Sequence, residues 1–132
     1  MAGTVEDAVV MDASAIVALL DREQGFERVG SALDGSAMST VNLAEVLSRA
    51  ALQGHDPVAI AARLGFAGLR FEPFTTDDAA AAGRLRPLTR ALGLSLADRA
   101  CLAAAARLLL PVLTADRALA RSRTGVVVEL IR

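Results

Sequence analysis

The sequence predicts an α/β fold, with a mostly parallel sheet at its centre and helices on both faces of that sheet. Short, wholly apolar segments such as residues 8–11 and 111–114 have the composition of buried parallel strands. Longer segments with helical spacing of apolar residues separate them, and this alternation is typical of parallel sheets. Because 132 residues is about the length of one domain, we expect a single domain over residues 1–132.

Local signals set the bounds of each expected element. Glycine ends two of the helical patterns, at Gly54 and Gly93, and Asp56-Pro57 supplies a cap and a first-turn proline. Pro87 lies inside one helical pattern and predicts a kink or a split there. The expected strands cover residues 8–11, 37–39, 70–74, 111–114 and 126–131. The expected helices cover residues 13–20, 24–33, 41–53, 57–65, 76–92, 95–109 and 115–121.

The composition excludes several classes of function. All 14 basic residues are arginine, and without lysine neither Walker-type ATP binding nor Schiff-base chemistry is available. One cysteine (Cys101) and one histidine (His55) exclude an internal disulfide and a zinc finger. The net charge of −1 and the absence of Tyr and Trp argue against a broad basic surface or a base-stacking platform for nucleic acid.

The chain carries no pattern of a secretion signal or a membrane span. Residues 1–7 are acidic, and the most apolar stretch, residues 100–115, is interrupted by Arg107 and Pro111. We therefore expect a cytoplasmic protein without membrane contact.

Four acidic residues follow the predicted strands closely. Asp12 comes directly after the first strand and Asp116 comes just after the fourth. Glu45 lies early in the helix after the second strand, and Asp98 lies in the first turn of the helix that Ser95 opens. Ligands bind at the carboxyl ends of parallel strands, so we expect these four side chains at one edge of the sheet.

Carboxylates that meet in this way need a cation. Two of them 4 Å apart repel by about 1 kcal/mol in water and about 4 kcal/mol at an effective dielectric constant of 20. A set of oxygen ligands alone favours Mg²⁺ or Mn²⁺ over zinc. Because such ions activate water and neutralise phosphoryl oxygens, the four acids predict a metal-dependent phosphodiesterase.

A structural role is the alternative for each acid. The sequences from Ser95 to Asp98 and from Asn42 to Glu45 fit a capping box, as does the segment 75–78. Asp12 and Asp116 are also suited to helix N-termini, where a negative charge is favourable. Taken singly, each acid favours the capping role, whereas their convergence after separate strands favours the metal site.

Four motifs occur in order along the chain. They are Val-Met-Asp12-Ala-Ser14-Ala, Ser39-Thr-Val-Asn42-Leu-Ala-Glu45-Val, Leu94-Ser-Leu-Ala-Asp98-Arg-Ala and Val112-Leu-Thr114-Ala-Asp116-Arg. Together they resemble the PIN domain, specifically VapC-type toxins, and the resemblance covers nearly the whole chain.

The resemblance implies a PIN-like three-layer sandwich and a Mg²⁺- or Mn²⁺-dependent endoribonuclease that cleaves an RNA substrate. It also implies a cognate VapB-type antitoxin, a homodimer and a toxin–antitoxin hetero-oligomer. By position, the family's four acidic residues match Asp12, Glu45, Asp98 and Asp116. Its supporting polar residues match Ser14, Asn42 and Thr114.

Other residues have weaker assignments. Arg99, Arg117 and Arg49 are candidates for RNA contacts, and solvated helix faces or an ion pair explain them equally well. The cluster Arg84, Arg86 and Arg90 fits an ordinary solvated helix better than an RNA or partner surface. We expect Cys101 in the core, His55 in a loop, and the side chains of Phe66, Phe71 and Phe74 packed under the third strand.

Other α/β families with an acidic Mg²⁺ pocket fit less well. Response-regulator receivers and haloacid-dehalogenase-type phosphatases both need a lysine that this chain lacks. A PIN-fold module that binds RNA or protein without cutting remains as an alternative. Because the helices are rich in Ala, Leu and Val, we also expect a second copy or the antitoxin to cover some apolar surface.

Overall fold

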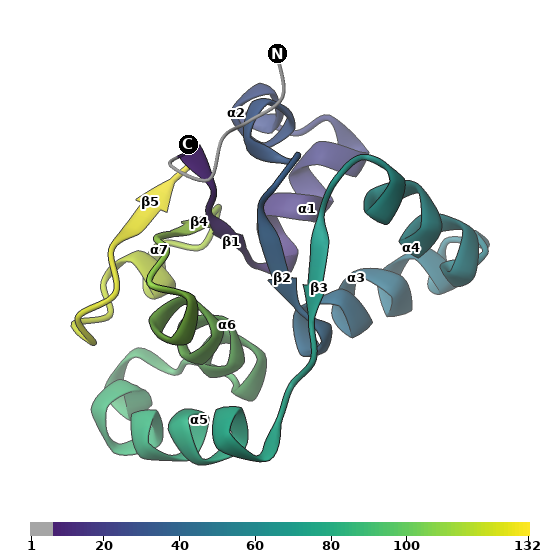
Figure 1. Cartoon of the computed structure of the whole chain (residues 1–132). Coiled ribbons are helices and arrows are strands. Elements are labelled where there is room, and N and C mark those ends of the chain that lie inside the picture. The colour runs from purple at the N-terminus through teal and green to yellow at the C-terminus, as the bar shows by residue number, and fades with distance from the viewer. Residues whose placement is uncertain (1–6) are drawn as a thin grey trace.

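The computed structural model describes residues 7–132, in which five strands form one parallel sheet in the order β3-β2-β1-β4-β5. The strands are β1 (Val10–Met11), β2 (Ala37–Ser39), β3 (Arg70–Glu72), β4 (Val112–Thr114) and β5 (Val128–Leu130). Figure 1 shows β1 at the centre, between β2 and β4. The parallel sheet is confirmed, although every strand except β2 is shorter than expected.

Helices connect the strands. Those within residues 7–132 are α1 (Ala13–Asp21), α2 (Phe26–Ala32), α3 (Thr40–Leu52), α4 (Pro57–Phe66), α5 (Thr76–Thr89), α6 (Leu96–Leu108) and α7 (Arg117–Ala120). Each expected helix is present, with bounds that differ by a few residues.

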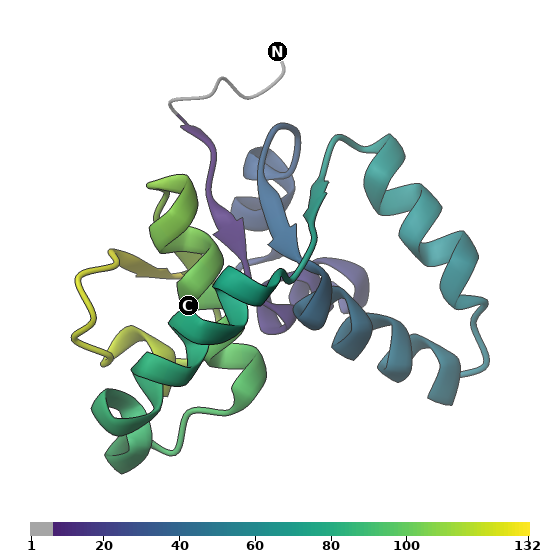
Figure 2. The ribbon, with the colours of Figure 1, turned by 60° about the horizontal axis from the view of Figure 1, so that its bottom comes forward.

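The helices cover the two faces of the sheet as two separate layers. Along β1 the side chains alternate, so that Met11 packs with α1 to α4 while Val10 packs with α6 and α7. Figure 2 shows α3 and α4 on one side of the strands and α5 and α6 on the other. The predicted three-layer α/β sandwich is therefore confirmed.

Pro87 does not split its helix. Helix α5 continues through Pro87 to Thr89 and then tightens into a 3-10 turn, Arg90–Leu92, before Gly93 ends it with a positive φ of 68°. Pro87 lacks an N–H, so one hydrogen bond is missing in the last turn of α5, and the tighter 3-10 turn follows directly after that turn.

Two sequence expectations were wrong. Ser39 caps α3 by accepting a hydrogen bond from the Val41 N–H, so the segment from Asn42 to Glu45 is not a capping box and Glu45 lies in the second turn. The side chain of Phe66 is 97% exposed at the end of α4, whereas Phe71 packs against the core as expected. Cys101 is buried in the core, as predicted.

No helix within residues 7–132 is long and apolar enough to cross a membrane.

Candidate functional site

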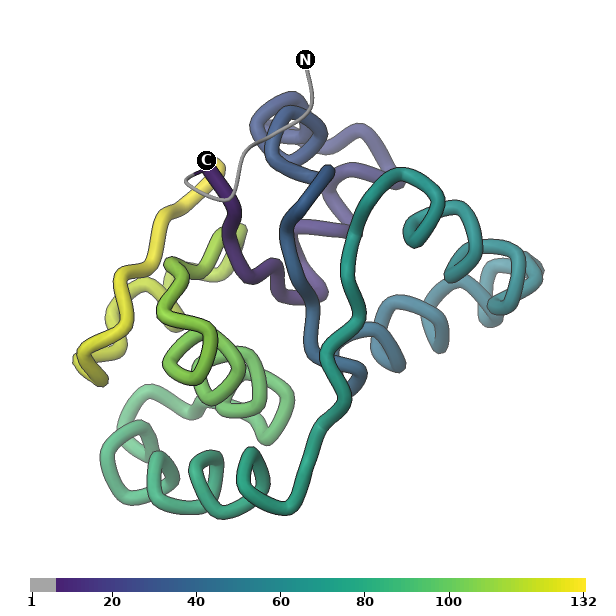
Figure 3. Tube along the Cα trace, in the orientation of Figure 1, coloured from purple at the N-terminus to yellow at the C-terminus, as the bar shows by residue number. Residues whose placement is uncertain are grey.

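The carboxyl ends of β1 and β4 lie where the sheet changes direction. After β1 the chain builds β2 and β3 on one side, and it then returns to build β4 and β5 on the other side (Figure 3). Such a switch point is where open parallel sheets bind ligands, because the connections diverge there and leave the strand ends uncovered. Asp12 follows β1 at this point, and Asp116 follows β4.

Asp12 is buried and fully engaged in hydrogen bonds. Its Oδ1 atom caps α1 by accepting from the Ala15 N–H at 2.9 Å. The Ser14 hydroxyl donates to its carboxylate at 2.8 Å, and the Thr114 hydroxyl donates to Oδ2 at 2.5 Å. Burial raises the pKa of Asp12, and these hydrogen bonds only partly offset that effect.

Ser14 and Thr114 join the end of β1 to the end of β4. Besides donating to Asp12, the Ser14 hydroxyl accepts from the Ala115 N–H at 2.9 Å. The Thr114 hydroxyl accepts from the Asp116 N–H, also at 2.9 Å. The two hydroxyls expected to support the site therefore fix the first and fourth acidic segments against each other.

Asp98 lies in the first turn of α6, where it completes a capping box with Ser95. Its Oδ2 atom accepts from the Ser95 N–H at 2.9 Å, and its own N–H donates to the Ser95 hydroxyl. The side chain is half-buried. One carboxylate oxygen of Asp98 is thus used in the N-terminal cap of α6.

Glu45 is exposed on α3, and its charge interacts with two of the other acids. Burial raises the pKa of Glu45 first, then the charge of Asp98, and more weakly that of Asp12, while a hydrogen bond from Asn42 lowers it. The charge of Asp98 also raises the pKa of Asp12. The structure therefore brings Asp12, Glu45 and Asp98 within electrostatic reach of one another.

Asp116 lies at the same edge of the sheet, and its side chain caps the helix that follows it. Its Oδ1 atom caps α7 by accepting from the Ala118 N–H at 2.9 Å. The side chain is half-buried, and its backbone joins the network of Thr114. The capping role is thus confirmed for Asp12, Asp98 and Asp116, whereas the metal site at this edge stays a prediction.

The acids fit a divalent cation in chemistry but not in distance. They offer only oxygen ligands, as Mg²⁺ and Mn²⁺ prefer, and three of them repel one another. Within residues 7–132, however, no three His, Cys, Asp or Glu side chains lie close enough together to hold a metal ion. The side chains are therefore placed near one another without forming a coordination shell.

The three candidate arginines lie apart from one another. Arg99 points away toward α5, where its Nη1 atom donates to the Ala82 carbonyl at 2.9 Å. Arg49 pairs with Asp21 of α1 at 2.7 Å. Arg117 is exposed in the first turn of α7, directly after Asp116.

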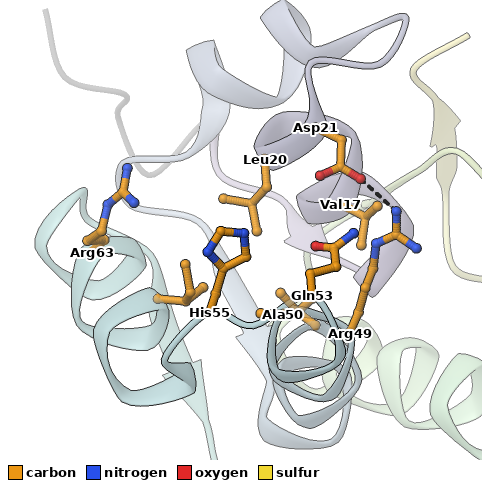
Figure 4. Close-up of a pocket in the computed structure, with 10 residues that line it drawn as sticks. Val17, Leu20, Asp21, Arg49, Ala50, Gln53, His55 and Arg63 are labelled. Carbon is orange, nitrogen blue, oxygen red and sulfur yellow. Dashed lines mark hydrogen bonds and ion pairs between the residues drawn. The ribbon is translucent and has the colours of Figure 1, made fainter.

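A pocket of about 170 Å³ lies between α1, α3 and α4, and sequence reasoning missed it. Figure 4 shows Leu20, His55, Arg63 and the ion pair of Arg49 with Asp21 around this pocket. The loop position expected for His55 is confirmed. No motif in the sequence marks this pocket, because its residues come from three helices and from the loop between α3 and α4 and share no spacing.

A family model of the PIN domain matches residues 9–123 of this chain. The chain belongs to the PIN domain family. No curated protein sequence matches it. The fold of this PIN domain is also similar to that of several solved structures.

One similar structure is a toxin–antitoxin complex from Klebsiella pneumoniae, with 18% identity, a TM-score of 0.73, and coverage of 95% of this chain and 98% of that one. Another is a DNA-bound VapBC from Salmonella typhimurium, with 19% identity, a TM-score of 0.72 and coverage of 95% and 98%. VapBC2 from Rickettsia felis, bound to a promoter DNA fragment, has 15% identity, a TM-score of 0.69 and coverage of 93% and 98%.

Proposed function

We propose that this PIN domain is a Mg²⁺- or Mn²⁺-dependent endoribonuclease and the toxin of a VapBC-type pair. One observation carries the proposal, which is the gathering of Asp12, Glu45 and Asp98 at the switch point of the sheet. No arginine or histidine among residues 7–132 forms an ion pair with any of these three acids. Clustered negative charge without an internal counter-ion favours binding of an external cation.

The residues divide into ligands and supports. Asp12, Glu45, Asp98 and Asp116 would hold the cation, and Ser14 and Thr114 would orient the carboxylate of Asp12. A bound Mg²⁺ or Mn²⁺ supplies charge neutralisation at the phosphate and an activated water for phosphodiester hydrolysis. Arg117, which is exposed next to Asp116, would contact an RNA phosphate.

The proposed partners are a cognate VapB-type antitoxin and a second copy of the chain. Toxin–antitoxin complexes among the similar structures support the first of these. Large apolar side chains are exposed on α3 and α4, among them Leu52 (90%) and Phe66 (97%). Apolar surface of this kind favours a protein partner, because covering it removes it from water.

Bacterial growth after induction of the protein alone tests the proposal, because a living cell offers every RNA at once. We expect arrest by the wild type and growth with Asp98→Asn at matched expression. Asp77→Asn is the matched control, since Asp77 is an exposed first-turn acid of α5 outside the site. RNA from arrested cells should contain new cleavage ends that depend on Asp98.

A catalytically silent PIN-fold module that binds RNA or protein is the second candidate. The observation in its favour is that, within residues 7–132, no three His, Cys, Asp or Glu side chains lie close enough together to hold a metal ion. Equal growth of cells with the wild type and with Asp98→Asn, together with intact RNA, would favour this module over the nuclease.

A further inference from the structure

The arginines of this chain are concentrated in one part of the sequence. Residues 79–128 contain eight arginines and only two acidic residues, Asp98 and Asp116, whereas the rest of the chain contains six arginines and thirteen acidic residues. This segment covers most of α5, all of α6 and α7, and the loop that leads to β5. A chain with a net charge of −1 therefore has a strongly basic part, which creates a local positive potential.

Two of these eight arginines are engaged inside the fold. Arg107 forms ion pairs with Asp78 and Glu72. Arg99 donates to the Ala82 carbonyl. The other six are exposed, and within residues 7–132 none of them forms an ion pair. These six, which we name the basic surface, are Arg84, Arg86, Arg90, Arg117, Arg121 and Arg123.

The fold brings the two ends of this segment together. Arg84 lines a groove of about 190 Å³ that is also lined by Thr124, the residue after Arg123. Leu92, in the turn after α5, and Ala118 of α7 pack against the same core cluster. Figures 1 and 2 both show the C-terminal end of α5 beside α7 and the loop before β5. The basic surface is therefore one patch, built from α5, the 3-10 turn and the segment that begins with α7.

A structural role explains only part of this patch. Arg86 and Arg90 lie at the C-terminal end of α5, where the last carbonyls of a helix favour a positive charge. Arg117 lies at the opposite end of its helix, and Arg123 lies in a loop. Cations that gather without partners repel one another, and an external polyanion removes that repulsion.

The basic surface adjoins the acidic edge at two points. Arg117 directly follows Asp116. The 3-10 turn that begins at Arg90 leads to the cap of α6, whose first turn carries Asp98. Because RNA carries a negative charge on each phosphate, the acids repel those phosphates that a bound cation does not neutralise. Arginines beside the acids offset this repulsion.

We propose that the basic surface binds the sugar–phosphate backbone of single-stranded RNA and leads the strand to the acidic edge. The inference rests on the proposed function, because it takes RNA as the substrate of that edge. Guanidinium groups form paired hydrogen bonds with phosphate oxygens, which position a strand without reading its sequence. All four phenylalanines precede residue 79 and the chain has no Tyr or Trp, so the segment of the basic surface offers no aromatic ring for stacking on a base.

Fluorescence anisotropy with a fluorescein-labelled oligouridylate tests the proposal, and EDTA in the buffer prevents metal-dependent cleavage of this probe. The double variant Arg121→Gln, Arg123→Gln should bind the probe at least about 5-fold more weakly than the wild type. The slope of log affinity against log salt concentration should become shallower by about 1.4, because two phosphate contacts are lost at about 0.7 each. Arg86→Gln, Arg90→Gln, which changes the other part of the patch, should give a similar loss.

Arg63→Gln, Arg70→Gln is the matched control. Arg63 on α4 and Arg70 on β3 are exposed, lie outside the basic surface and form no ion pair within residues 7–132. This control loses the same net charge, so it should bind the probe with nearly the affinity of the wild type. All three double variants change exposed side chains and should melt close to the wild type.

Each other outcome has a distinct meaning. A wild type that does not bind the probe, unchanged affinity in the two variants, or an equal loss in the control would overturn the basic surface as an RNA site. Oligoglutamate that binds as tightly as oligouridylate, with the same losses, would assign the surface to an acidic protein partner instead. RNA binding that depends on these arginines, without growth arrest that depends on Asp98, would support the surface and overturn the nuclease.

Discussion

Asp12 caps a helix and also lies at the centre of the candidate site. It accepts hydrogen bonds from the Ala15 N–H and from two hydroxyls, one of them on the neighbouring strand β4. Because these donors fix its orientation, Asp12 is the most rigidly held of the four acids. A ligand held in advance loses little conformational entropy when a cation binds.

Asp98→Asn removes the negative charge of this side chain but keeps its size and shape. At about 100 times its dissociation constant, Mn²⁺ should raise the melting temperature of the wild type by about 10 °C. The variant should gain far less, because asparagine keeps the cap on Ser95 but lacks the charge. Thermal melting with and without Mn²⁺ measures the gain in melting temperature of each protein, and Asp77→Asn is the control. An equal gain in the wild type and in Asp98→Asn would contradict the acidic site.

Glu45 should make the metal-free protein less stable as pH rises. Burial and the charges of Asp98 and Asp12 raise the pKa of Glu45, so the folded chain binds this proton more tightly than the unfolded chain does. Stability is therefore lost as pH increases through the raised pKa.

Glu45→Gln should remove this dependence. Because the side chain is exposed, we expect the variant to melt only about 2 °C above the wild type at pH 7. The gap should close as pH falls toward the ordinary glutamate pKa of 4.5. Melting curves of both proteins between these two pH values test this prediction. A difference in melting temperature that widens at low pH would contradict the electrostatic interpretation.

At the scale of single residues, the sequence predicts where the acids lie, but it does not predict where the side chains next to them point. Asp12 and Asp116 follow strands directly, so topology alone brought them to one edge. Arg99 is adjacent to Asp98, yet successive helical residues point about 100° apart, and Arg99 reaches α5 instead. Local sequence does not reveal which neighbouring helix receives such a side chain.

At the scale of elements, α6 is held to α5 and to the end of β3 by one arginine. Arg107 donates to Asp78 at 3.0 Å and to Glu72 at 3.1 Å. Burial alone would raise the pKa of Asp78, but hydrogen bonds from Arg107 and Thr75 outweigh it and lower that pKa. The stability that this ion pair contributes is therefore present at neutral pH and lost as pH falls through the lowered pKa.

Arg107→Met should destabilise the fold by leaving the buried Asp78 without its partner. Since the Arg107 side chain is 39% exposed and water screens the pair, we expect a loss of about 2 kcal/mol at pH 7. Urea unfolding measures the loss, which should shrink in acid. Arg86→Met, at an exposed position of α5, should cost much less, and an equal cost for both would contradict the role of the ion pair.

Helix starts were harder to predict than helix positions. The capping boxes at Thr75 and Ser95 are present because both partners lie at the true helix start. The similar pattern at Asn42 failed because α3 begins at Thr40, so these residues lie inside the helix. Asn42 could then be buried between two helices, which a local pattern does not show.

At the scale of the whole molecule, exposed apolar side chains predict self-association. We expect light scattering at high concentration to show a species larger than a monomer. Phe66→Ser should reduce its mass while leaving the melting temperature nearly unchanged, because Phe66 is 97% exposed. Leu109→Ser, at an 89% exposed position that ends α6, is the comparison variant. A clean monomer of the wild type would contradict self-association.

The periodicity of apolar residues predicts the layers of the fold, but it does not predict which apolar surface stays exposed. Apolar spacing identifies the inner face of each helix, and the two core clusters confirm that pattern. Phe66 was misplaced because it ends α4, where no neighbouring element covers it. The lack of cover is a property of the assembled fold, and no window of sequence contains it.

The hydrogen bond from Thr114 to Asp12 spans 102 positions of the chain, and it has a consequence for synthesis on the ribosome. Asp12 is translated early, but the strand that completes its surroundings is translated only much later. Until β4 has emerged and paired with β1, Asp12 lacks its cross-strand hydroxyl and the acidic edge is unformed. The proposed nuclease would therefore gain its site only after β4 has joined the sheet.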